Sequence, residues 1–216
     1  MDPQTEPVTT GTRLPSTPLL VAATQRLEQN SHLDRLRDIY AAAARPLDRW
    51  SGSELLRSGV IGHALHPLLT DVPIGCWTAA SILDLRGRPE DQDASRRLIG
   101  VGLAAVGPTA LTGLAEWSHT GREAQRIGAL HGALNVVATA LYITSWVARG
   151  RRRHGLGVAA ALAGATVAGA SGYLGGHLTA ARKIGSRDPA YALDPVEEAP
   201  ELRGNPHRDG VQPPPI

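Results

Sequence analysis

The sequence contains no phenylalanine, one cysteine, and only four tryptophans and four tyrosines among its 216 residues. With so few large side chains to fill a globular core, we expect close packing between small residues instead. The single cysteine, Cys76, excludes an internal disulfide framework and a metal site built from a cysteine cluster. The net charge of +2 is small, and no basic run interleaved with aromatics indicates nucleic-acid binding.

Charged residues are scarce in the middle of the chain, which the overall mean hydropathy of −0.13 conceals. Four apolar stretches are bounded by charges: 67–83, which carries Asp71, and then 98–115, 127–148 and 156–181, which contain no Asp, Glu, Lys or Arg. A helix needs roughly twenty residues to cross a hydrocarbon core of about 30 Å. A soluble bundle would need polar outer faces, which the last two stretches lack. The sequence therefore predicts an all-α integral membrane four-helix bundle, with spans at about 66–85, 98–117, 127–148 and 156–179.

The parts of the chain on either side of these spans have a different composition. Residues 1–17 are rich in Pro and Thr without a signal-peptide pattern, and residues 185–216 are polar and interrupted by proline, so both are predicted to be disordered. In residues 18–54, apolar side chains recur every three or four positions among charges, which predicts an amphipathic helical segment. This segment suits either the membrane surface or a position over the end of the helical core. Residues 55–184 are predicted to form the membrane domain.

Small residues recur every four positions in the fourth stretch. One ridge comprises Gly164, Ala168, Gly172 and Gly176, and a second comprises Gly157, Ala161, Ala165 and Gly169. Such ridges let helix backbones approach closely in lipid, where apolar burial gives no net attraction between helices. They indicate tight helix pairing and offer faces for oligomerisation.

Loop arginines indicate the orientation of the spans. The connections after the first and third spans carry eight arginines, against six basic residues on the opposite side. By the positive-inside rule, the arginine-rich loops face the cytoplasm. The prediction is a multi-pass protein of the cell membrane with both termini outside the cytoplasm.

Polar residues within the apolar stretches gather toward one end of the predicted bundle. In an up-down-up-down bundle, the starts of the first and third helices lie beside the ends of the second and fourth. This arrangement places five histidines at one face, namely His63, His66, His119, His131 and His177. Ionisable groups at membrane depth are costly and by default indicate a functional site.

Two kinds of cofactor fit these residues. The first is a haem b held between histidines of facing helices, with His131 and His177 as the predicted axial pair and His66 as a further candidate ligand. The second is a non-haem metal ion, for which the candidate ligands are His63, His66, Asp71, His131 and His177. The residues expected to orient these ligands are Glu116, His119, Asn135 and Tyr173. A purely structural role for the histidines, as helix caps or hydrogen-bonding partners, is the alternative.

Four motifs in the same order resemble the DUF2231 family of predicted membrane proteins. They are Gly62-His63-Ala64-Leu65-His66-Pro67-Leu68-Leu69-Thr70-Asp71-Val72-Pro73-Ile74-Gly75, Pro108-Thr109-Ala110-Leu111-Thr112-Gly113-Leu114-Ala115-Glu116-Trp117, the His131 to Asn135 segment, and Ser171-Gly172-Tyr173-Leu174-Gly175-Gly176-His177-Leu178. The resemblance covers about residues 55–184 and implies a four-helix membrane domain. In many actinobacterial relatives a Rieske iron-sulfur domain follows, which implies a link to electron transfer.

This chain departs from that fused pattern because no cysteine follows residue 187, so it can ligate no Rieske cluster. We therefore predict a membrane-embedded, haem- or metal-binding electron-transfer module that works with a separate Rieske-type or other redox protein. The alternative is a non-catalytic membrane anchor or scaffold for such a partner. No nucleophile elbow or zincin signature indicates a hydrolase.

Overall fold

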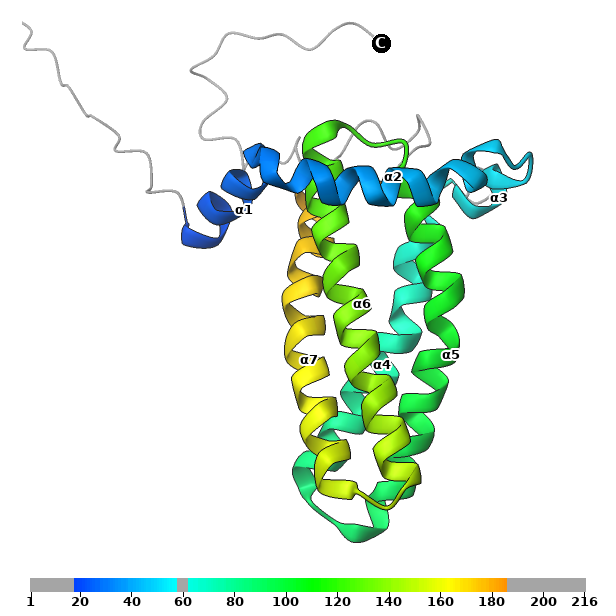
Figure 1. Ribbon diagram of the computed structural model, residues 1–216, viewed down its shortest axis with the longest axis vertical. Helices are drawn as coiled ribbons and strands as arrows, with labels where there is room; N and C mark the ends of the chain where they lie inside the picture. The colour runs from blue at the N-terminus through cyan, green and yellow to red at the C-terminus, as the bar shows by residue number, and fades with distance from the viewer. Residues whose placement is uncertain (1–17, 58–61, 186–216) are drawn as a thin grey trace, which may run out of the picture.

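Four long helices stand side by side in the structure, a computed structural model that describes residues 18–57 and 62–185 (Figure 1). They are α4 (Leu65–Arg86), α5 (Gln92–Trp117), α6 (Arg122–Gly150) and α7 (His154–Gly176), and a π-helical turn, His177–Ala181, continues α7. All four are long and apolar enough to cross a membrane. The predicted all-α four-helix membrane bundle is confirmed. The predictions of disorder for residues 1–17 and from 186 onward lie outside the described residues.

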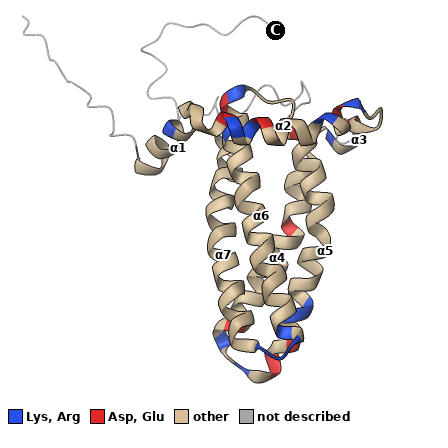
Figure 2. Cartoon of the chain, in the orientation of Figure 1, with Lys and Arg blue, Asp and Glu red and all other residues tan. Residues whose placement is uncertain are grey.

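Charged residues gather at the two ends of the bundle and leave most of its length uncharged (Figure 2). This distribution is what a bilayer requires, since ionised groups avoid the hydrocarbon region. Asp71 is an exception, because it is exposed in the second turn of α4.

The bundle consists of two helical hairpins, α4 with α5 and α6 with α7. Within each hairpin the helices contact one another extensively, whereas α5 with α6 and α4 with α7 share far fewer contacts. The small-residue ridges of α7 agree with this close pairing, since Gly157, Ala161 and Gly164 are buried. Gly87 ends α4 with φ 67°, a left-handed conformation that glycine adopts without strain.

The hairpins interlock in the half of the bundle that contains the α4–α5 and α6–α7 connections. Trp77 of α4 stacks on Tyr142 of α6, with ring centroids 4.0 Å apart and planes inclined by 18°. Nearer the connections, the fully buried side chains of Asp84 and Arg149 form an ion pair, and Arg149 also donates to Gln92 of α5. These contacts tie three of the four helices together at this end.

Three short helices cover the opposite end of the bundle: α1 (Leu19–Gln29), α2 (Asp34–Arg49) and α3 (Ser53–Arg57). Figure 1 shows α2 lying across the ends of the long helices. Tyr40 and Ala44 of α2 pack against Trp117, and the Tyr40 and Trp117 rings meet edge to face at 6.1 Å. The amphipathic segment thus packs over the end of the core.

Buried and half-buried ion pairs hold this covering segment in place. Asp34 accepts hydrogen bonds from Arg126 at 2.7 Å and from Arg122 at 2.8 Å, and these two guanidinium groups hold the pKa of the Asp34 carboxyl well below its usual range. Glu28 of α1 is buried and pairs with Arg182 and His177 beyond the end of α7. Hydrogen bonding from Arg182 is the main cause of the lowered pKa of Glu28.

Replacing Arg149 with methionine should destabilise the protein strongly. The carboxylate of Asp84 would stay buried without its cation, and breaking a buried ion pair in this way typically costs about 3–5 kcal/mol. Thermal unfolding in detergent measures the effect, with the exposed Arg151→Met as a matched control. Equal midpoints for Arg149→Met and wild type would show that the pair does not stabilise the fold.

Acidification should loosen α2 from the bundle. Because the folded pKa of Asp34 is depressed, its ion pairs contribute stability above its unfolded pKa of about 3.9, and this contribution is lost as the pH falls toward the folded value. Hydrogen exchange of the α2 amides, corrected for intrinsic rates, should therefore rise below about pH 4. At pH 7, Asp34→Asn should have the same effect, and Asp38→Asn, whose carboxylate is mostly exposed, should not. An unchanged α2 in Asp34→Asn would exclude this role.

Candidate functional site

His66 lies in the first turn of α4 and points toward the interior between the hairpins. Its Nδ1 lies 2.9 Å from the backbone carbonyl oxygen of Thr109 on α5, so Nδ1 carries the proton and donates it. The ring lies directly over Gly113, where a Cβ would come within 2.7 Å of the imidazole. A glycine at this position lets the ring rest against the α5 backbone. Pro67, next in the chain, is accommodated because the first helical turn needs no backbone donor there.

His131 occupies the corresponding place in the second hairpin. Its Nδ1 lies 2.8 Å from the backbone carbonyl oxygen of Ser171 on α7, and its ring rests over Gly175, where a Cβ would come within 3.0 Å. The buried Ser171 hydroxyl lies 2.9 Å from the same Nδ1. The Asn135 side-chain amide, one turn further along α6, donates to Nε2 at 3.0 Å. With the proton on Nδ1, Nε2 of His131 carries the lone pair.

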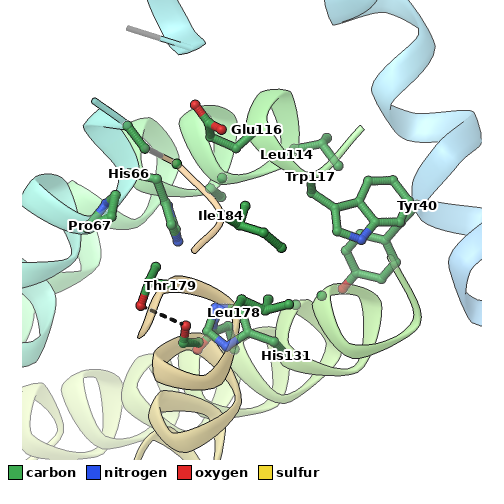
Figure 3. Close-up of a pocket in the computed structure, with 18 of the residues that line it drawn as sticks. Tyr40, His66, Pro67, Leu114, Glu116, Trp117, His131, Leu178, Thr179 and Ile184 are labelled. Atoms are coloured by element: carbon green, nitrogen blue, oxygen red, sulfur yellow. Dashed lines mark hydrogen bonds between the residues drawn. The ribbon is translucent and has the colours of Figure 1, made fainter. Parts of the chain in front are cut away.

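The two imidazoles face each other across the gap between the hairpins. Their ring centroids are 6.4 Å apart and their planes are nearly perpendicular, at 88°. Figure 3 shows the two rings entering the space from opposite sides. Nδ1 is engaged by a backbone carbonyl in both rings, which leaves Nε2 as the nitrogen available to a ligand.

Two cavities flank this histidine pair. The α5–α6 cavity has a volume of about 440 Å³ and extends to Tyr40, Glu116 and Trp117 near the covering helices, and the α4–α7 cavity has a volume of about 390 Å³ and extends to Trp77 and Tyr142. Both are lined by His66, Val106, Ala110, His131, Asn135 and Thr139. They therefore meet at the histidine pair and form a slot between the hairpins. Ligand pockets typically have volumes of roughly 300–1,000 Å³.

The structure places the other predicted ligands away from this slot. Nε2 of His177 donates a hydrogen bond to the Glu28 carboxylate at 2.8 Å, and Arg182 shares that carboxylate, so His177 belongs to the contact that holds α1. His63 and Asp71 are exposed. Within residues 18–57 and 62–185, no three or more His, Cys, Asp or Glu side chains are grouped to hold a metal ion.

The four residues expected to orient the ligands have different surroundings. Asn135 contacts His131, and Glu116 is buried in the wall of the α5–α6 cavity (Figure 3). His119 instead lies beside Arg57 and the Ser118 hydroxyl at the covered end of the bundle. Tyr173 is 41% exposed on α7. Of this set, Asn135 makes a hydrogen bond to a histidine of the slot.

Sequence reasoning missed the residues that hold the two rings. Thr109 and Ser171 supply the accepting carbonyls, and Gly113 and Gly175 make room for the imidazoles. A signal was present, since a hydroxyl residue stands four positions before a glycine in both helices. That spacing places carbonyl and glycine on one helix face.

Comparison with known proteins identifies the membrane domain. The model of the family described as "Predicted membrane protein (DUF2231)" matches residues 62–188, which is more than half of the chain. No match was found among curated proteins or among solved structures. The matched segment contains all four long helices and both histidines of the slot. The chain belongs to the DUF2231 family of predicted membrane proteins.

Proposed function

We propose that the domain binds a haem b between His66 and His131 and serves in electron transfer. The observation that carries this proposal is the geometry of the pair: two imidazoles, each fixed through Nδ1, face each other across a slot at 6.4 Å. Two imidazoles that bind one metal from opposite sides, at roughly 2 Å each, have ring centres on the order of 6 Å apart. The separation thus suits a metal between the two Nε2 atoms.

The number of ligands favours haem over a non-haem ion. A non-haem site usually needs three or four protein ligands, whereas a porphyrin supplies the equatorial nitrogens and needs only two axial side chains. In the described part of the chain, the slot offers two histidines and no larger ligand group. In the proposed site, His66 takes the place of His177 as the partner of His131.

The slot also suits the shape and polarity of a porphyrin. A flat group placed midway between the two imidazoles would lie between the hairpins. One part of it would occupy the α5–α6 cavity and the other part the α4–α7 cavity. Most lining residues are apolar or small, as a macrocycle requires. Binding needs one local change, because the Asn135 amide must release Nε2 of His131.

Two histidine ligands leave no open coordination position on the iron, which favours electron transfer over oxygen chemistry. A haem held by His66 and His131 would supply one-electron chemistry, taking an electron from a reduced partner protein and giving it to an oxidised one. An iron-sulfur protein is a suitable partner, because its cluster also carries one electron at a time. This electron transfer involves no proton transfer and no bond to a substrate.

The absorption spectrum of the purified protein tests the proposal. Protein produced with added haem and isolated in detergent should contain about one iron per chain and give the reduced-minus-oxidised bands of a low-spin haem. His66→Ala and His131→Ala should each abolish that low-spin spectrum. His119→Ala and His177→Ala serve as controls, because neither side chain lies in the slot.

The same experiment separates the alternatives. A spectrum lost in His177→Ala and kept in His66→Ala would contradict the proposed pair and support the His131 and His177 pair predicted from the sequence. Colourless, iron-free wild-type protein would overturn haem binding and leave the anchor or scaffold function. With haem bound, the perpendicular rings further predict a strongly anisotropic low-spin ferric signal in electron paramagnetic resonance.

A further inference from the structure

Residues with the same structural role in the two hairpins are separated by constant numbers of positions. In the first helices, α4 and α6, the spacing is 65, and it joins His66 to His131, Trp77 to Tyr142 and Asp84 to Arg149. In the second helices, α5 and α7, the spacing is 62, and it joins Gly102 to Gly164, Gly107 to Gly169, Thr109 to Ser171 and Gly113 to Gly175.

Contacts within the hairpins repeat at these spacings. Trp77 lies against Gly102, where an added Cβ would collide with the indole, and Tyr142 lies against Gly164, where a Cβ would come within 3.0 Å of the phenol ring. The two imidazoles rest on glycines in the same way, one turn from the carbonyl that each ring contacts. Each hairpin thus contains the same two contacts of a ring with a glycine.

The ends and the open faces of the hairpins repeat as well. α4 ends at Gly87 with φ 67°, and the residue 65 positions later, Arg152, follows α6 with φ 57°. The left-handed conformation is uncommon for a residue with a side chain, so its recurrence at the same position is informative. Gly107 and Gly169 also correspond, and a Cβ at either would meet no atom within 4 Å.

Contacts between the hairpins join each position to its own counterpart. The two histidines face each other, Trp77 stacks on Tyr142, and Asp84 pairs with Arg149. A twofold axis has this property, since it brings equivalent residues opposite one another. Because α4 and α6 run in the same direction, this axis lies along the bundle.

We infer that the four spans are two copies of one helical hairpin, related by a twofold axis that passes between His66 and His131. Each copy supplies the same half-site: an imidazole, the carbonyl that accepts its Nδ1 proton, and the glycine on which the ring rests. Gly113 and Gly175 are therefore equivalent positioning residues. A ligand on the axis meets the same groups from both sides, which favours a flat group with two similar faces. That last step rests on the proposed function, whereas the duplication does not.

The duplication also accounts for a position at which the copies differ. Two identical charged residues at the position of Asp84 and Arg149 would meet across the axis and repel each other. Opposite charges remove that repulsion, so divergence at this position stabilises the assembled pair of hairpins. At the histidine position identical residues are compatible, because one ligand can bind both rings.

Paired glycine substitutions test the inference with two readouts. Gly113→Ala and Gly175→Ala each force an imidazole away from its helix, so both should lower the thermal midpoint of the haem-free protein and reduce haem occupancy at least tenfold. Gly107→Ala on α5 and Gly155→Ala on α7 are the controls, because neither position lines a cavity. Both should leave occupancy unchanged and keep or raise the midpoint, because their added methyl groups meet no neighbour.

The inference would be overturned if only one of the two substitutions had an effect. An example is a Gly113→Ala protein that is impaired while the Gly175→Ala protein unfolds and binds haem as wild type does. Exchanging the stacked rings, Trp77→Tyr with Tyr142→Trp, provides a test without haem. Equivalent positions predict a midpoint within a few degrees of wild type. Failure of the ring exchange to fold would contradict the duplication. If the wild-type protein binds no haem but Gly113→Ala and Gly175→Ala both lower the thermal midpoint, the proposed function would be refuted and the duplication supported.

Discussion

The contact of each imidazole with the backbone of its neighbouring helix is the constraint on which the site depends. A ring can donate its Nδ1 proton to the carbonyl of Thr109 or Ser171 only because a glycine stands one turn further along the same helix. Glycine is unfavourable inside helices by about 1 kcal/mol relative to alanine, and close packing against another group is one reason for it to occur there. The two rings supply that reason at Gly113 and Gly175.

Packing divides the bundle into a closed half and an open half. In the closed half, the stacked Trp77 and Tyr142 rings and the buried Asp84 and Arg149 pair fill the space between the hairpins. In the open half, two cavities meet at the histidines. The covering helices close the end of the open half through Tyr40. A rigid half thus fixes the separation of the hairpins, and this separation sets the width of the slot.

Sequence patterns predicted the four spans because uncharged runs of sufficient length have few other stable solutions. They also placed His66 and His131 at one end of the bundle, since direction alternates from helix to helix. They could not show which rings face each other, because depth along a helix says nothing about lateral position. The pairing of His177 with Glu28 depends on a folded-back α1, which no local pattern of α7 reveals. The constant spacings of 65 and 62 become visible only when contacts show which residues correspond.

An experimental density map of the detergent-purified protein, produced with added haem, tests the central claim most directly. The claim is that the two hairpins hold one planar ligand between His66 and His131. The account predicts flat, non-protein density in the slot, continuous with Nε2 of both rings and with the Asn135 amide turned away. A map in which α5 packs closely against α6, with Nε2 of His131 still bonded to Asn135, would contradict it.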